Sequence, residues 1–147
     1  MVELVVVIIV LAVLAAVAIP RLAGRTGFEA RGFADEVASA LRYGQRSAIA
    51  MRRTVTVRVA TPTNQQPCAL RLCLDNNCTQ QVTDPATSAP FCLRPPALVT
   101  LLNASESDTR FDARGRPNAA GQYLVSSSAP GDASRTIVIE AESGYVR

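Results

Sequence analysis

The sequence contains no histidine, no lysine and no tryptophan, so all 15 of its basic side chains are arginine. Without histidine there is no imidazole to act as the base of a serine or cysteine nucleophile, or to ligate a metal. Without lysine there is no P-loop lysine, no Schiff base and no Ser-Lys dyad. The 12 acidic residues form no cluster along the chain. We therefore expect a protein that is not an enzyme and that holds no metal and no cofactor.

Charged residues are also nearly absent from the first nineteen positions, where Glu3 is the one ionisable side chain. Residues 4–19 carry no polar side chain, and a helix that is apolar on every face must be buried in lipid or among other helices. At about 1.5 Å per residue this run spans roughly 24 Å, slightly less than a hydrocarbon core of about 30 Å. No basic segment precedes it, and Pro20 and Arg21 stand where a signal peptide would be cleaved. We therefore expect a transmembrane helix that is retained.

Four cysteines lie close together, at Cys68, Cys73, Cys78 and Cys92. Their spacing lacks the C-x2-C knuckles of a zinc site, and there is no histidine to complete a mixed site. Disulfides are the better interpretation, and because they persist in oxidising compartments we expect this part of the chain outside the cytoplasm. Four cysteines allow three connectivities. The spacing favours Cys73 with Cys78, closing a tight turn, and Cys68 with Cys92, whereas a bond between Cys73 and Cys92 would contradict this choice.

A second helix is expected after a bend. Pro20 has no N–H to donate, and Gly24 and Gly27 follow it closely. Thr26 and Glu29 have the spacing of a capping box, which would start the new helix. From residue 28 to residue 53 the apolar residues recur with a helical period. The main stripe consists of Phe33, Val37, Leu41 and Ala48, with Ala34, Ala38, Ala40 and Met51 beside it.

The period changes to two at residue 54, where Val55, Val57 and Val59 alternate with polar residues. Further strands are expected at 70–74, 96–102, 110–113, 122–127 and 135–141, a loop at 80–90, and an extended segment at 144–147. The pattern predicts an α+β fold with a long N-terminal hydrophobic helix packed on a small antiparallel β-rich globular head. We divide the chain into a transmembrane helix at 1–27 and an extracytoplasmic head, with its amphipathic helix, at 28–147.

The net charge of +3 is unevenly distributed along the chain. Residues 21–60 have eight arginines against three acidic residues, a balance of +5, and residues 61–147 have seven arginines against eight acidic residues, a balance of −1. The basic stretch follows the apolar helix directly, so it could face anionic lipid headgroups or an acidic partner. A solvated helix face explains it equally well.

The N-terminal segment, Val2-Glu3-Leu4-Val5 and onward through Ala18-Ile19-Pro20, resembles the first helix of type IV pilins and type II secretion pseudopilins. The rest of the chain is similar to the minor pilins and pseudopilins of the GspH/FimT type. Three features carry this second resemblance: a helix leading into Val55-Thr56-Val57, a Phe-x-x-x-Gly element at Phe111 and Gly115, and an Ile137-Val138-Ile139 strand that ends near Ser143 and Gly144.

The resemblance implies a single-pass protein of the bacterial inner membrane whose head lies in the periplasm and which is then drawn into a filament. The filament would be a type IV pilus or a type II secretion pseudopilus, with this subunit at or near the tip. Its partners would be other pilin or pseudopilin subunits, through helix packing, and assembly-platform proteins. In such families the early glutamate neutralises the N-terminal amine of a neighbouring subunit, a role that falls here on Glu3. Pro20 ends the segment that carries the resemblance. A carboxylate at the headgroup level is the alternative for Glu3.

Mature pilins of this kind begin with Phe-Thr two residues before the position of Met1, after a basic leader that ends in Gly. We therefore expect the processing site and the methylated N-terminal residue to lie ahead of Met1. Arg21 and Arg25 follow the apolar run and oppose the orientation that the positive-inside rule favours. The cysteines and the family outweigh this and favour a periplasmic head.

DNA capture is a second functional hypothesis, because FimT-like pilins are associated with DNA uptake through a basic C-terminal motif resembling Gly-Arg-x-Arg. In the corresponding segment, 144–147, only Arg147 fits, and a missing arginine removes a phosphate contact. A second patch could form from Arg110, Arg114 and Arg116 beside Tyr123 or Tyr145, although arginines in a Gly-Pro loop are usually solvated charges. An unrelated single-span binding protein of the extracytoplasmic space is the third hypothesis.

Overall fold

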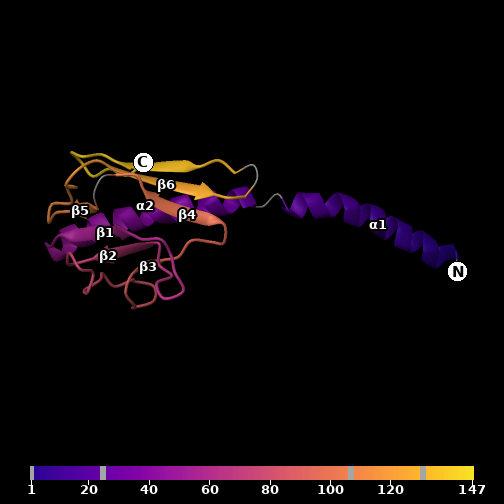
Figure 1. Cartoon of the computed structure of the whole chain (residues 1–147), viewed down its shortest axis with the longest axis horizontal. Helices are drawn as coiled ribbons and strands as arrows, with labels where there is room; N and C mark the ends of the chain where they lie inside the picture. The colour runs from indigo at the N-terminus through magenta and orange to yellow at the C-terminus, as the bar shows by residue number, and fades with distance from the viewer. Residues whose placement is uncertain (1, 24–25, 106–107, 130–131) are drawn as a thin grey trace.

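Helix α1 (Val2–Ala23) extends away from a head that contains helix α2 (Thr26–Met51) and all the strands (Figure 1). The computed structural model describes residues 2–23, 26–105, 108–129 and 132–147, with residues 17–23 and 26–28 described by their backbone alone. Helix α1 continues past Pro20 to Ala23, and residues 24 and 25, which belong to the segment where the sequence predicts a bend, lie outside the described residues.

Two antiparallel sheets make up the β part of the head. The first has the order β3-β2-β1-β5, and the second has the order β4-β6-β7. Their strands are β1 (Val55–Val59), β2 (Leu70–Cys73), β3 (Cys92–Leu93), β4 (Val99–Asn103), β5 (Thr109–Phe111), β6 (Gly121–Ser127) and β7 (Arg135–Ile139). The C-terminal residues pair with β7 at the edge of the second sheet, since Val138 and Arg147 exchange backbone hydrogen bonds of 2.8 and 3.0 Å.

Helix α2 packs against both sheets and supplies one side of the core. The stripe predicted on it is buried, with Phe33 1% exposed and Val37, Leu41 and Ala48 fully buried. Opposite it lie inward-facing side chains of the two sheets, among them Val55, Val57, Leu70, Leu72, Leu101, Phe111, Tyr123, Val125, Ile137 and Ile139. This packing confirms the α+β fold and explains why the alternation of β1 follows the helical period directly.

Some predictions at the edges of elements are wrong. Met51 is 40% exposed because α2 ends there, and the chain turns at Arg52 with a φ of 51°. Strand β4 begins at Val99 rather than residue 96, since prolines occupy positions 95 and 96 and cannot donate to a ladder. Strand β3 was missed, because two residues are too short to show a period.

Both disulfides lie around β2 and β3. Cys68 is bonded to Cys92 with a Cα–Cα distance of 5.2 Å, and Cys73 to Cys78 with 4.8 Å. These are the two pairs that the spacing favours. The loop between Cys73 and Cys78 is organised by Asp75, whose carboxylate accepts hydrogen bonds from the Thr79 hydroxyl and from the N–H groups of Thr79 and Gln80. The Thr79 hydroxyl, followed by these N–H groups, lowers the pKa of Asp75.

The core supplies a first testable prediction. Replacing fully buried Leu41 with Ala should destabilise the chain by about 2–5 kcal/mol, because the change removes packing and leaves a cavity. The matched control is Leu102→Ala, whose side chain is 51% exposed and which should change stability by less than about 0.5 kcal/mol. Urea unfolding of the full chain in detergent, with disulfides intact, measures both. Equal effects of the two substitutions would contradict the packing described.

Candidate filament-assembly site

The first part of α1 has an apolar surface that the head does not cover. All residues from 2 to 16 are exposed, and among the large apolar side chains the exposed fraction runs from 49% at Val5 to 78% at Val2. Apolar side chains occupy every side of this segment, so no orientation of the helix removes them from water. An uninterrupted surface of this kind marks a site of association with lipid or with other helices.

Glu3 lies in the first turn of α1, at the end of the helix farthest from the head (Figure 1). Between residues 2 and 16 it is the one ionisable side chain. An acidic group in a first turn is favoured by the helix dipole. When the surrounding apolar surface is buried, however, an ionised carboxylate is costly unless a positive partner meets it. Within residues 2–16, Glu3 is therefore the position at which burial requires a charged partner.

Membrane association was expected for the same helix. Among the residues described in the structure, no helix reaches the length and hydropathy that a membrane span requires.

The other end of the molecule is held together by Gln45 of α2. Its side-chain N–H group donates to the backbone oxygens of Gly115, at 2.9 Å, and Ser143, at 3.2 Å. Gly115 has a φ of 78°, and Gly144 has a φ of 69°, both in the left-handed region. A Cβ atom on Gly144 would lie 2.5 Å from the Gln45 amide nitrogen and 2.7 Å from the Gly115 oxygen. The two glycine motifs singled out in the sequence thus meet at one side chain.

The arginines considered for DNA binding do not share one environment. Arg116 and Arg114 lie in the turn after β5, where their backbone N–H groups donate to the Asp112 carboxylate at 2.9 and 2.8 Å and thereby lower the pKa of Asp112. The Arg116 guanidinium also pairs with Glu142 at 3.1 Å. Arg110 is exposed on β5 in the first sheet, while Arg147 lies beside β7 in the second.

Two tyrosines, Tyr123 and Tyr145, are the aromatic candidates for this patch, and only one of them is accessible. Tyr123 is fully buried in the core, and burial raises its pKa to about 12. It therefore cannot present a ring to a nucleic acid, and that part of the prediction is wrong. Tyr145 is 60% exposed and keeps its ring at the surface.

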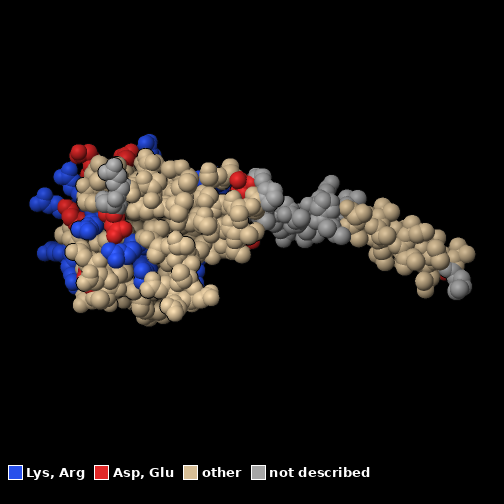
Figure 2. All heavy atoms as spheres, viewed as in Figure 1, with Lys and Arg blue, Asp and Glu red and all other residues tan. Residues whose placement is uncertain are grey.

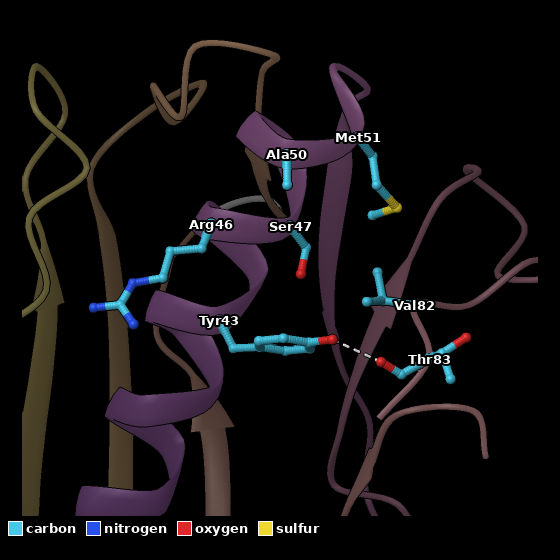
Figure 3. A pocket seen from close by; sticks show the side chains of 7 residues that line it. All are labelled: Tyr43, Arg46, Ser47, Ala50, Met51, Val82 and Thr83. Carbon is cyan, nitrogen blue, oxygen red and sulfur yellow. Dashed lines mark hydrogen bonds between the residues drawn. The ribbon is translucent and has the colours of Figure 1, made fainter. Parts of the chain in front are cut away.

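A groove beside α2 escaped the sequence reasoning. Tyr43 is its central residue, and its hydroxyl donates to the backbone oxygen of Thr83 at 2.7 Å (Figure 3). The Tyr43 ring also stacks on Phe91, with a centroid distance of 5.6 Å. Two adjoining hollows of about 520 and 500 Å³ share Tyr43. Much of the opposite wall belongs to residues 80–90, which the sequence predicts as a loop, and a loop prediction does not indicate a site. The sequence offers one signal for this surface. At helical spacing, one face of α2 carries Ser39, Tyr43 and Arg46 in a row.

Comparison with known proteins gives a consistent set of similarities. Residues 34–144 match the family described as Type II transport protein GspH. Two crystal structures of the type IV minor pilin FimU from Pseudomonas aeruginosa (strain PAO1) have a similar fold. The form in space group P21 has a TM-score of 0.57 and 17% identity, covering 81% of this chain and 87% of that chain. The form in space group P65 has a TM-score of 0.54 and 16% identity, and the match covers 80% of this chain and 90% of that chain. No curated protein matches the sequence.

The Gln45 contacts give a second prediction. Gln45→Ala should lower the free energy of unfolding by about 1–2 kcal/mol, because the oxygens of Gly115 and Ser143 lose their donor. Amide exchange should accelerate in residues 112–116 and 140–145. The control is Gln122→Ala, an exposed position on β6, for which less than about 0.5 kcal/mol is expected. If exchange in both loops is unchanged in Gln45→Ala, the joining role of this side chain is refuted.

Proposed function

The chain belongs to the family described as Type II transport protein GspH, minor pilins and pseudopilins that are structural proteins rather than enzymes, and we propose that it assembles into a filament through α1. The filament is a type IV pilus or a type II secretion pseudopilus, and this chain is a minor subunit at or near its tip. The observation that carries the proposal is the exposed apolar surface of residues 2–16.

The energetics of α1 require that its surface be held out of water, in lipid or among other helices. Removing one large aliphatic side chain from water contributes about 1.5–3 kcal/mol, and eleven exposed Val, Leu and Ile side chains lie between residues 2 and 14. The inner membrane holds this surface before assembly, and the α1 helices of other pilin or pseudopilin subunits cover it afterwards. Assembly-platform proteins act at the transfer between these two environments.

The placement of the head follows from its cysteines. Both disulfides lie in the part of the chain after α1, and structural disulfides persist in oxidising compartments. This supports a single-pass arrangement with residues 28–147 in the periplasm and residues 1–27 as the membrane and filament segment. Pro20 belongs to the same segment and cannot donate a backbone hydrogen bond to the residue four positions before it.

Glu3 provides specificity within the apolar surface. The helices can slide along one another with little change in apolar contact, whereas one carboxylate in an apolar setting needs its partner at one place. The partner with suitable chemistry is the positively charged N-terminal amine of a neighbouring subunit. Pairing there fixes the axial register of each new subunit.

The role of Glu3 is tested by Glu3→Val in a cell that makes the filaments. The variant should enter the membrane fraction as the wild type does, because its apolar surface is larger, but its incorporation into sheared filaments should fall at least tenfold. Removing one partner of a buried ion pair costs about 3–5 kcal/mol because the other charge is left unpaired, and a tenfold change corresponds to about 1.4 kcal/mol. The control is Glu29→Val, at an exposed position of α2. Unchanged incorporation of Glu3→Val would reject the pairing.

DNA capture remains a second candidate function on one observation. Arg110 and Arg114 are exposed, and within the described ranges the ion pairs involve Arg58 and Arg116 instead. If the chain is a structural subunit alone, the full chain in detergent should not bind duplex DNA beyond weak charge attraction. Micromolar binding that falls steeply between two salt concentrations, and that Arg110→Gln with Arg114→Gln weakens, would favour DNA capture instead. Titration of labelled duplex DNA measures this.

A further inference from the structure

The turn before β4 holds a leucine in a backbone conformation that this residue type disfavours. The N–H of Val99 donates to the oxygen of Pro96 at 3.2 Å, so residues 96–99 form a turn with Leu98 at its third position. Leu98 has a φ of 68°, and turns with a positive φ at that position favour Gly or Asn. Ser128 holds the backbone there, because its N–H and hydroxyl donate to the Leu98 oxygen at 2.9 and 3.4 Å. The turn is therefore strained by its own side chain.

Packing within the head does not offset this strain. Among the Val, Leu and Ile side chains of the head that the structure describes, Leu98 has the largest exposed fraction, 59%. The neighbouring Ala97 is exposed as well. A leucine that is both strained and left in water gains nothing from its own fold, which indicates a contact outside the chain.

Leu98 lies at the end of the head that is nearer to α1. Strand β6 runs toward α1 (Figure 1) and ends at Ser127, which pairs with Val99 of β4. The bond from the Ser128 N–H to the Leu98 oxygen continues this ladder by one residue. The turn at residues 96–99 is therefore at the α1 end of the second sheet.

This end of the head carries few charges. Strands β4 and β6 contain no basic and no acidic side chain. Arg94 precedes the turn and is exposed, whereas Asp132, beyond the end of β6, is half-buried. In Figure 2 the charged atoms gather at the end of the head opposite to α1, and the surface toward α1 shows few of them. An exposed leucine and an arginine on a surface of low charge fit the interface of a bilayer with anionic headgroups.

We propose that the turn before β4 is a second membrane contact, in which Leu98 inserts into the periplasmic leaflet of the bilayer that holds α1 before assembly. Arg94 then lies among the anionic headgroups of that leaflet. The proposal rests on the proposed function, which places α1 in the membrane and the head directly above it. Because Leu98 lies at the end of the head nearer to α1, the helix and the turn reach the same bilayer.

The Leu98 contact is weak by itself and acts because α1 anchors the chain. A single leucine buries little apolar surface, but α1 keeps the turn next to the bilayer and makes the contact effectively intramolecular. Two points of contact fix the rotation of the head about α1, which one helix alone leaves free. The contact is broken when α1 leaves the membrane for the filament.

The absence of tryptophan makes a direct test available. Leu98→Trp places a single tryptophan in the turn, and Leu102→Trp, at a position of β4 that is 51% exposed, is the matched control. Leu11→Trp reports on α1. Each full-length variant is placed in nanodiscs of phosphatidylcholine and phosphatidylglycerol, with or without brominated acyl chains, which quench a nearby tryptophan. Bromination should lower the emission of Leu98→Trp about twofold, because its ring lies at the interface, and should leave Leu102→Trp unchanged.

The wild-type chain supplies a second readout, because tryptophan itself favours membrane interfaces. Leu98 and Leu102 have similar exposed fractions, 59% and 51%, so hydroxyl radicals should label them to a similar extent wherever both meet water. In nanodiscs we expect several-fold lower labelling of Leu98 than of Leu102, since lipid covers only the first. Equal labelling of the two leucines, or equal quenching of Leu98→Trp and Leu102→Trp, overturns the proposal.

The outcomes also separate this proposal from the function on which it rests. Quenching at position 11 without quenching at position 98 leaves α1 in the membrane and refutes the Leu98 contact. Absence of quenching at position 11 refutes the membrane placement of α1, and the Leu98 contact with it. If Leu98→Trp is unquenched in nanodiscs but its emission shifts to the blue in sheared filaments, a neighbouring subunit rather than lipid covers this side chain, and the proposal is wrong.

Discussion

The structure depends on one constraint: α1 has apolar side chains on every side along residues 2–16, and no part of the chain that the structure describes covers them. A helix of this kind cannot be completed by folding of the same molecule, because the hydrophobic effect drives its surface into lipid or against other helices. The head is built separately, with its own core between α2 and two sheets. The division of labour between α1 and the head follows, since one part is completed by association and the other by folding.

Helix α2 connects these two parts. Its buried stripe, centred on Val37 and Leu41, holds the sheets, while Gln45 ties the loops at Gly115 and Ser143 to the end away from α1. Its third face forms the groove around Tyr43. The two disulfides brace the opposite wall of that groove, around β2 and β3. The same helix therefore determines the shape of the head and forms one wall of its groove.

Much of the fold could be predicted from periodicity, because burial imposes a period wherever an element packs on one side. The stripe of α2 and the alternation of β1 are of this kind. Strand β3 and the exposure of Met51 could not be predicted, since two residues have no period and the end of a helix depends on what covers it. The Tyr43 groove was also out of reach, because its far wall is an irregular segment whose course depends on tertiary packing. Tyr123 gave a wrong expectation since a tyrosine in a strand has the same spacing whether its ring is buried or exposed.

The central claim is that α1 leaves the membrane and is buried among the helices of other subunits. Leu11 lies in an apolar stretch of α1. Replacing it with a photoreactive amino acid, then shearing filaments from cells and irradiating them, tests this claim directly. We predict that the photoreactive residue at position 11 links to α1 of another pilin or pseudopilin subunit in the filament fraction. Links to lipid alone, with the chain absent from filaments in a cell that makes them, would contradict it.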